Sequence, residues 1–244
     1  MSVDKLYESN NYLIVNKPYD MYINSDDEYE KNTVTYHIAA PDSHLSTSAF
    51  PLHFVQRLDY ATSGVLCIAK NKSSAAKAGK LFEKRLTKKY YLAVLRGHVQ
   101  FEVADIGFDV GVDATTQDSN HRMTALTTSR SSANCIQSRQ AHTRVLRLEI
   151  GYYEGDPASV VLLKPITGRR HQLRVHCDAI GHTIVGDYTY SNTRDSTPYR
   201  MFLHATRCRM NSRADSTQPC LTPILTSNQG DKPPSTRTHA VQPS

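Results

Sequence analysis

The feature that most restricts how this chain can fold is a short polar turn between two apolar runs, residues 54–58 and 65–69. Both runs have the composition of β-strands, so the sequence predicts two strands joined by this turn. The turn contains Asp59, followed by Thr62, Ser63 and Gly64. A carboxylate in a loop that two strands hold in place can face a cleft. The same aspartate can instead do no more than cap the turn through its own backbone.

Size and composition fit a protein with one sizeable core. The chain has 244 residues, of which 39% are hydrophobic, enough for one core or for two subdomains that share a cleft. No apolar run approaches the length of a membrane span, and Asp4 and Glu8 argue against a transit peptide. We therefore expect a cytoplasmic or nuclear protein that is monomeric and does not bind membranes.

Charge favours a polyanionic partner without requiring one. Lys and Arg together number 29, against 23 Asp and Glu, for a net charge of +6. The five cysteines are odd in number and show no paired spacing, so neither a disulfide framework nor a Cys-rich zinc site is expected. His171 and His176 are poorly spaced for one helical face and have no obvious third ligand, so no metal site is predicted.

A second polar motif, Thr-Gly-Arg-Arg-His-Gln-Leu-Arg-Val-His, occupies residues 167–176. Thr167 can cap a helix and Gly181 suits the position just after one, so a helix is predicted between them. Arg170 and Arg174 are one turn apart and would concentrate positive charge on one face. The predicted buried stripe of this helix is Leu173, Cys177 and Ile180.

Residues 88–97 have the aromatic and branched composition of a strand closed by a glycine. Alternation puts Lys89 and Tyr91 on one face and Tyr90 on the other, so only one of the adjacent tyrosines can face a cleft. A tyrosine on a strand is often a core residue with its hydroxyl satisfied. Beside a reactive carboxylate it can instead stack on a base or move a proton.

Elsewhere, hydrophobic patterning predicts strands at residues 12–17, 103–110, 121–126, 139–150 and 159–164, and helices at 33–40 and 71–86. The helix at 71–86 can be capped by Asn71 or Ser73, and its basic outer face is either a solvated surface or one that follows phosphates. Residues 129–138 are predicted to form a loop and 151–157 a turn. The polar composition after residue 212 predicts a folded domain at 1–212 and a flexible tail at 213–244.

Three of these segments resemble motifs of the RluA family of RNA pseudouridine synthases. Residues 57–64 match its Arg-Leu-Asp-x-x-Thr-Ser-Gly motif, residues 89–93 its Lys-x-Tyr-x-Ala motif and residues 168–174 its Gly-Arg-x-His-Gln-x-Arg motif. Stretches around Lys17-Pro18, Gly186-Asp187-x-x-Tyr190 and Leu203-His204-Ala205 also resemble family sequences. The order and number of these motifs make the likeness specific, and it covers roughly residues 11–210.

The chain departs from the family pattern at three positions. Gln56 stands where the family usually has histidine, Asp20 where it has glycine, and Thr183 where it has proline. The change at Gln56 and the lack of an S4-type RNA-binding module are shared with the eukaryotic RNA pseudouridylate synthase domain-containing members. That subgroup is therefore the expected place of the chain in the family.

The resemblance implies an α+β fold, with a long, curved, mostly antiparallel sheet in two halves, helices outside and a cleft between the halves. It implies isomerisation of uridine in rRNA, tRNA or mRNA, without a cofactor. Asp59 would attack the anomeric carbon or remove the 2′ proton, Arg174 would keep it ionised, and Tyr91 would stack on the extruded base. Further candidates for substrate contact are Arg57, Lys89, Arg169, His171, Gln172 and Leu173. Candidates for phosphate contact are Lys70, Lys72, Arg85, Lys88, Lys89, Arg169 and Arg170.

Two other readings of the sequence remain open at this point. The departures at Gln56 and Asp20 would suit a protein that binds RNA on the same fold but has lost catalysis. A basic hydrolase that pairs Asp59 with His171 or His176 is the other alternative, and no further residue supports it.

Overall fold

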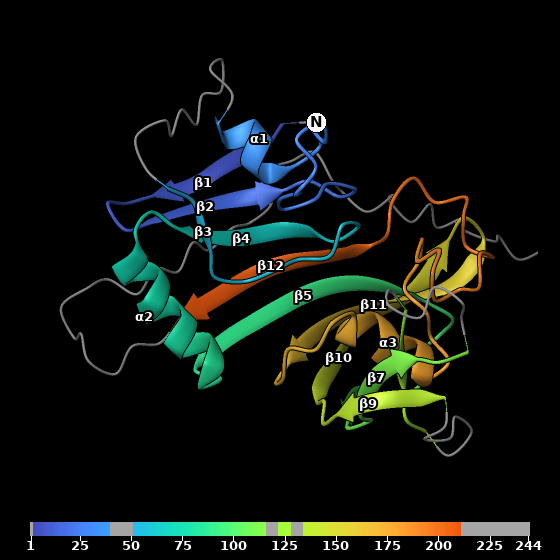
Figure 1. Ribbon diagram of the computed structural model, residues 1–244. Coiled ribbons are helices and arrows are strands. Elements are labelled where there is room, and N and C mark those ends of the chain that lie inside the picture. The colour runs from blue at the N-terminus through green and yellow to red at the C-terminus, as the bar shows by residue number, and fades with distance from the viewer. Residues whose placement is uncertain (1, 40–50, 116–121, 128–133, 211–244) are drawn as a thin grey trace, which may run out of the picture.

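The computed structural model describes residues 2–39, 51–115, 122–127 and 134–210 (Figure 1). Within this part of the chain, nine strands form one sheet in the order β1-β2-β4-β12-β5-β11-β10-β6, with β3 paired to β4. All neighbours are antiparallel except β4 and β12, which are parallel. A second sheet has three strands, β8-β7-β9. The α+β prediction, with a long and mostly antiparallel sheet, is confirmed.

The large sheet has two halves that meet at β12. The first half contains β1 (Asp4–Glu8), β2 (Tyr12–Lys17), β3 (His53–Phe54) and β4 (Ser63–Ala69), with α1 (Val34–Ala39) and α2 (Lys72–Glu83). The second contains β5 (Thr87–Arg96), β6 (Val103–Ile106), β10 (Thr143–Tyr153) and β11 (Asp156–Pro165), with α3 (Gln172–Ala179). The strand β12 (Leu203–Met210) lies between β4 and β5. The smaller sheet contains β7 (Val110–Asp113), β8 (Met123–Ala125) and β9 (Cys135–Arg139).

Each half has its own hydrophobic core. One core joins β2 and β4 to α1, and the other joins β5, β10 and β11 to α3. All seven residues of β4 are buried, because Leu66 and Ile68 pack into the first core on one face of the sheet and Val65 and Cys67 into another cluster on the opposite face. Figure 1 shows α1 beside the first half and α3 beside the second, with β12 and β5 crossing between them.

Gly64 permits the join between the halves. It adopts a φ of 113°, and an added Cβ would run into the backbone of Ala205 on β12. Gly64 and Ala205 are register partners in the parallel pairing of β4 and β12. The glycine of the Asp59 motif therefore lets the two halves approach at the start of β4.

Most predicted elements are present with shifted ends. The strand at 12–17 and the helix at 33–40 correspond to β2 and α1, and residues 88–97 to β5. The second helix has Asn71 as its N-cap, accepting a hydrogen bond from the Ser74 N–H over 2.9 Å. It ends at Glu83 instead of Leu86, because the chain turns at Arg85 with a left-handed φ of 55°.

Other boundaries were predicted wrongly. The strand β1 was missed, and the strand before Asp59 ends at Phe54, so residues 55–58 lie outside any strand. Thr167 does not cap α3, which begins at Gln172. The predicted loop at 129–138 contains β9, although residues 128–133 lie outside the described part. The turn predicted at 151–157 is shorter in the structure. Only residues 154–155 connect β10 to β11 in a hairpin, and their φ values are 53° and 89°.

Some predictions concern residues that the structure does not describe. The tail at 213–244, the domain boundary at 212 and Cys220 all lie outside the described ranges. The four cysteines within those ranges are unpaired. In the described residues, no helix has the length and apolar character needed to cross a bilayer.

Candidate active site

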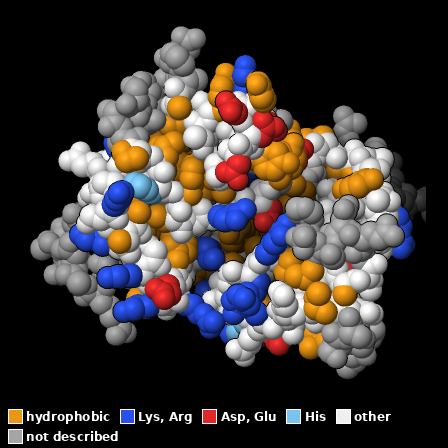
Figure 2. All heavy atoms as spheres, in the orientation of Figure 1, with side chains coloured by type: hydrophobic (Ala, Val, Ile, Leu, Met, Phe, Trp, Pro, Cys, Tyr) orange, Lys and Arg blue, Asp and Glu red, His pale blue; other side chains and the backbone are white. Residues whose placement is uncertain are grey.

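Asp59 lies in the turn that leads from β3 into β4. The Thr62 N–H donates to its backbone carbonyl over 3.1 Å, and the preceding Leu58 is buried in the core of the first half. The Asp59 side chain remains 30% exposed. The turn therefore fixes the backbone while leaving the carboxylate within reach of a ligand. Figure 2 shows a hollow near the middle of the face it draws, rimmed by Lys and Arg side chains.

Lys17, at the end of β2, anchors the Asp59 turn from inside. Its side chain is fully buried, and Nζ donates to the carbonyl oxygens of Met21 at 2.7 Å, and of Pro18 and Tyr60 at 2.9 Å each. Three acceptors match the three N–H donors of an ammonium group. Burial lowers the pKa of Lys17 to about 7, and the negative charge of Asp59 opposes this shift. The lysine thus ties the end of β2 to the residue that follows Asp59.

Arg174, in the first turn of α3, connects Asp59 to a second carboxylate. Its Nη1 lies 3.8 Å from Asp59 Oδ2, while Nε and Nη2 donate to the two oxygens of Asp187 over 2.7 and 2.8 Å. The side chain of Asp187 has no exposed surface. Burial alone would lower the pKa of Arg174, but the hydrogen bonds and charge of Asp187, with Asp59, raise it above its usual value. The guanidinium is therefore charged and its orientation is fixed.

Tyr190 holds Arg174 from another side. The guanidinium carbon of Arg174 lies 4.9 Å from the centre of the Tyr190 ring, a cation–π contact. The Tyr190 hydroxyl accepts from the Met123 N–H over 3.1 Å and lies 2.9 Å from His171 Nδ1. His171 directly precedes α3 and adopts a left-handed φ of 52°, which is uncommon for a residue other than glycine. Tyr190 thus positions both the arginine and the start of its helix.

Acid is expected to destabilise the protein through His171. Burial lowers the pKa of His171 from 6.5 to about 4; Asp59 opposes the shift, while Arg174 and Arg170 add to it. The unfolded chain therefore takes up this proton more readily than the folded one. The contribution of His171 is present above pH 6.5 and is lost as the pH falls through about 4. We expect His171→Gln to flatten the decline in the free energy of unfolding over that range, measured by urea denaturation.

The control for this experiment is His37→Gln, on α1 and outside the site. It should keep the wild-type dependence on pH. A wild-type slope that persists in His171→Gln would contradict the assignment.

Tyr91 projects from β5 to the place where the two cores meet, and it packs against both. Burial raises the pKa of Tyr91 above its usual value, and Cys208 and Asp59 act in the same direction. The phenol is therefore protonated at neutral pH. Leu173, on α3, is 7% exposed and belongs to the core of the second half. The turn before β4, the strand β5 and the helix α3 thus bring Asp59, Tyr91 and Arg174 into one region.

Gln172 is turned into the protein. It is 3% exposed, and its Oε1 accepts from the Thr167 hydroxyl at 2.7 Å and the Arg169 N–H at 2.9 Å. Its Nε2 donates to the His142 carbonyl and the Thr143 hydroxyl, both at 3.0 Å. These four bonds use the full capacity of the amide. No donor or acceptor of the Gln172 amide therefore remains for RNA. The side chain instead stabilises the loop before α3.

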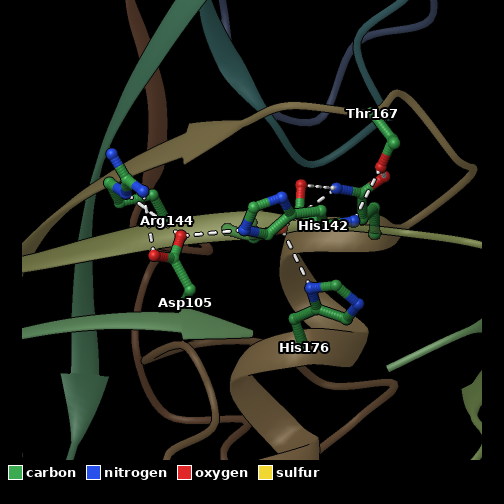
Figure 3. Close-up of polar contacts among 7 residues, drawn as sticks. Asp105, His142, Arg144, Thr167 and His176 are labelled. Carbon is green, nitrogen blue, oxygen red and sulfur yellow. Dashed lines mark hydrogen bonds and ion pairs between the residues drawn. The ribbon is translucent and has the colours of Figure 1, made fainter. Parts of the chain in front are cut away.

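The network around Gln172 continues through Thr167 and His142 to the exposed Asp105 and Arg144, and Figure 3 draws these links. The His142 N–H donates to the Thr167 hydroxyl over 2.9 Å. The ring of His142 lies 2.8 Å from Asp105, whose carboxylate also accepts from Arg144 over 2.9 and 3.0 Å. The start of α3 is therefore braced against β10 and β6, far beyond the residues of its own motif.

The same network explains His176. This residue is fully buried, with Nδ1 2.9 Å from the Thr143 hydroxyl and Nε2 2.9 Å from the Phe108 carbonyl. Both ring nitrogens are engaged inside the protein, so His176 is not placed to act as a base for Asp59. In the described residues, no group of three His, Cys, Asp or Glu side chains is arranged to hold a metal.

Removing the Gln172 amide is expected to lower stability. Gln172→Leu would strip partners from buried polar groups, each of which costs about 1–3 kcal/mol when left unsatisfied. We expect a lower urea midpoint for Gln172→Leu and also for Gln172→Glu, which keeps the acceptor Oε1 but replaces the Nε2 donor by an oxygen that faces the His142 carbonyl. The control is Asp105→Asn at the exposed end of the network, which should keep the wild-type midpoint. A wild-type midpoint for Gln172→Leu would contradict the bracing role.

The other predicted contact residues are more dispersed. Arg57 is exposed beside the Asp59 turn, and Arg169 Nε donates to the Gln140 carbonyl over 3.0 Å. The ammonium of Lys89 lies 6.0 Å from the centre of the Phe82 ring and close to Gly168, so it borders the loop before α3. Lys70 pairs with Glu8 at 2.8 Å. The remaining phosphate candidates are exposed: Lys72, Arg85, Lys88 and Arg170.

Sequence reasoning gave no role to three residues that organise the site. Asp187 and Tyr190 were noticed only as part of a family-like stretch, and Lys17 only as the residue before Pro18. A signal was present in each case. A lysine closes the apolar strand at residues 12–17, and an acid and a tyrosine follow the helix of Arg174 at fixed spacing.

This sheet, with an aspartate and an arginine meeting beside a half-buried tyrosine, is the arrangement that the three motifs imply for a pseudouridine synthase. The chain belongs to the RNA pseudouridylate synthase family, whose model matches residues 11–179. The predicted family is therefore confirmed. At the level of the family, the protein is an RNA pseudouridine synthase that acts on RNA.

The similar proteins support the same assignment. The zebrafish (Danio rerio) RNA pseudouridylate synthase domain-containing protein 1 is 44% identical over 202 residues, covering 82% of this chain and 67% of the relative. The dual-specificity RNA pseudouridine synthase RluA of Vibrio parahaemolyticus is 31% identical, covering 83% and 75%. The solved structure of human RNA pseudouridylate synthase domain containing 1 has a TM-score of 0.76 and 36% identity, covering 91% of this chain and 82% of that one.

Proposed function

We propose that Asp59 is the carboxylate with which this enzyme isomerises uridines of rRNA, tRNA or mRNA to pseudouridine. The observation that carries the proposal is the 3.8 Å contact of Asp59 with Arg174, whose other nitrogens are committed to the buried Asp187. Asp187 and Tyr190, which hold the arginine, are themselves buried. The charge of Arg174 is therefore available to Asp59 without reorganisation when RNA binds.

The reaction needs a carboxylate that stays ionised in a cleft that RNA closes. A lone carboxylate removed from water takes up a proton instead. At the separation of Asp59 and Arg174, an effective dielectric of about 20 gives an attraction of about 4 kcal/mol, less where solvent reaches the pair. Arg174 thus supports the ionised form of Asp59.

Asp59 begins the reaction at the ribose. It either attacks C1′, so that the N1–C1′ electron pair leaves with the uracil, or removes the 2′ proton, so that the same bond breaks by elimination. The detached base turns and C5 bonds to C1′. In the first route the ester bond between Asp59 and C1′ breaks as the new bond forms, and in the second the abstracted proton returns to C2′. The hydrogen on C5 leaves as a proton, and N1 takes up a proton. No electrons are gained or lost overall, so the isomerisation needs no oxidant or reductant.

Tyr91 and Leu173 supply the walls of the site. The target base must first leave its stack, at a cost of a few kcal/mol, and must then be held while it is detached. The phenol of Tyr91 is neutral and lies near Asp59, so it can stack on the uracil without competing for its charge. The exposed guanidinium of Arg57 can occupy the space that the base leaves.

The test is release of tritium from RNA labelled at carbon 5 of uridine. The purified protein, without added cofactor, is expected to release tritium from total cellular RNA and to leave pseudouridine in the digested product. A protein that binds this RNA with the salt dependence of phosphate contacts, yet releases no tritium, would support the non-catalytic alternative.

A further inference from the structure

A cavity adjoins the candidate active site, and the chemistry proposed above does not need it. Its volume is about 550 Å³, within the range of small-molecule sites. It is lined by the turn after β2, by the residues after Asp59 and by the segment from Gly186 to Met201. Arg174 and Ala61 belong to its wall, whereas Asp59 and Tyr91 do not. The cavity therefore shares Arg174 with the active site, while most of its lining lies outside the catalytic set.

Three exposed tyrosines make part of the cavity lining aromatic. Tyr60, Tyr188 and Tyr199 line it and are 42%, 58% and 61% exposed. The ring of Tyr60 lies 4.6 Å from that of Tyr22. The ring of Tyr199 makes an edge contact with Tyr19 at 6.0 Å. Exposed aromatic rings that neighbouring rings hold in place are suitable platforms for a flat ligand.

The charges around the cavity disfavour a phosphate. Arg174 already makes two hydrogen bonds to Asp187. Asp195 accepts from Arg96 Nε over 2.8 Å, and Asp20 adds a further carboxylate to the wall. The lining thus contains three acids, Asp20, Asp187 and Asp195, and two arginines, Arg174 and Arg200. This balance of charge favours a neutral, planar group.

We propose that this cavity binds an unpaired base of the substrate RNA next to the target uridine. The inference rests on the proposed function, because Arg174 lines the cavity and also contacts Asp59. The stacked base would position the strand, so that the target nucleotide is presented to Asp59. Base–aromatic stacking is tolerant of sequence, so the cavity would select for an unpaired neighbour of the uridine.

The experiment measures equilibrium binding of a short, fluorescein-labelled RNA with a single uridine by anisotropy. Matching RNAs carry one abasic nucleotide at each flanking position in turn. All proteins carry Asp59→Asn, so that the RNA is not converted during the measurement. The test variants are Tyr188→Ala and Tyr199→Ala, with Tyr199→Phe as the variant that keeps the ring. The control is Tyr152→Ala, because Tyr152 is 64% exposed but does not line the cavity.

One abasic position is expected to raise Kd about tenfold or more in the parent protein. Tyr188→Ala and Tyr199→Ala should raise Kd for the intact RNA by a similar factor and lose sensitivity to that position. Tyr199→Phe and Tyr152→Ala should keep the parent pattern. A pattern in which no flanking base matters, or one that the alanine variants leave unchanged, would overturn the inference.

Tritium release by the protein with Asp59 intact separates this inference from the proposed function. If tritium is released while no flanking base matters, only the base-binding cavity is refuted. If no tritium is released, the proposed function fails whatever the binding pattern.

Discussion

Asp59→Asn is expected to abolish pseudouridine formation while leaving RNA binding nearly intact. Loss of a group that acts as a general base typically lowers the rate about 10²–10⁴-fold, and loss of a nucleophile lowers it further, by up to about 10⁶-fold. The substitution keeps the size of the side chain, removes its charge and replaces one carboxylate oxygen by an NH2 group. Single-turnover tritium release and anisotropy binding on the same RNA would measure the two effects separately.

The matched control is Asp26→Asn, an exposed aspartate in the loop that follows β2. It should keep wild-type rates. Tritium release by Asp59→Asn at a rate close to that of the wild type would show that another group starts the reaction.

Arg174→Met is expected to lower stability as well as activity. It leaves the fully buried Asp187 carboxylate without its guanidinium partner. Breaking a buried ion pair by removing one member typically costs about 3–5 kcal/mol. Urea denaturation of the variant should therefore show a much lower midpoint, and tritium release should be lost because Asp59 also loses its positive neighbour.

A double substitution separates these two roles. Arg174→Met with Asp187→Asn removes both charges while keeping an oxygen for the Tyr190 N–H, which donates to Asp187 over 3.2 Å. We expect the double variant to regain part of the lost stability, since the two changes remove one interaction and are not additive, but to remain inactive. Recovery of activity in the double variant would contradict the role of Arg174 toward Asp59. The control is Arg144→Met, in an exposed pair with Asp105, which should keep the wild-type midpoint.

Hydrophobic patterning is a local signal and predicted many strands and two clear helices. The arrangement of the sheet in two halves was implied by the family resemblance. The alternation in residues 88–97 allowed only one of the adjacent tyrosines to face a cleft, and the family resemblance selected Tyr91, which packs against both cores. The ends of elements could not be predicted in the same way. The Thr167 hydroxyl bonds to the buried Gln172 side chain instead of capping the helix, a choice that depends on β10, which is distant in sequence.

The candidate site shows the same division. The motifs identified Asp59 and Arg174 as candidate catalytic residues, and the structure places Asp59 Oδ2 3.8 Å from Arg174 Nη1. The partners that fix Arg174 could not be predicted from the sequence. Asp187 lies 13 residues further along the chain, and it contacts Arg174 only when the segment after α3 folds back. Gln172 illustrates the opposite error. Its place in a motif suggested substrate contact, whereas four internal hydrogen bonds occupy its amide.

The central claim is that the carboxylate of Asp59 makes pseudouridine in cellular RNA. Mapping pseudouridines in cells with the wild-type gene, without the gene and with Asp59→Ala would test it most directly. We predict that every position lost on deletion is also lost with Asp59→Ala, at equal protein abundance. Pseudouridine that disappears on deletion but persists in the Asp59→Ala cells would contradict the claim.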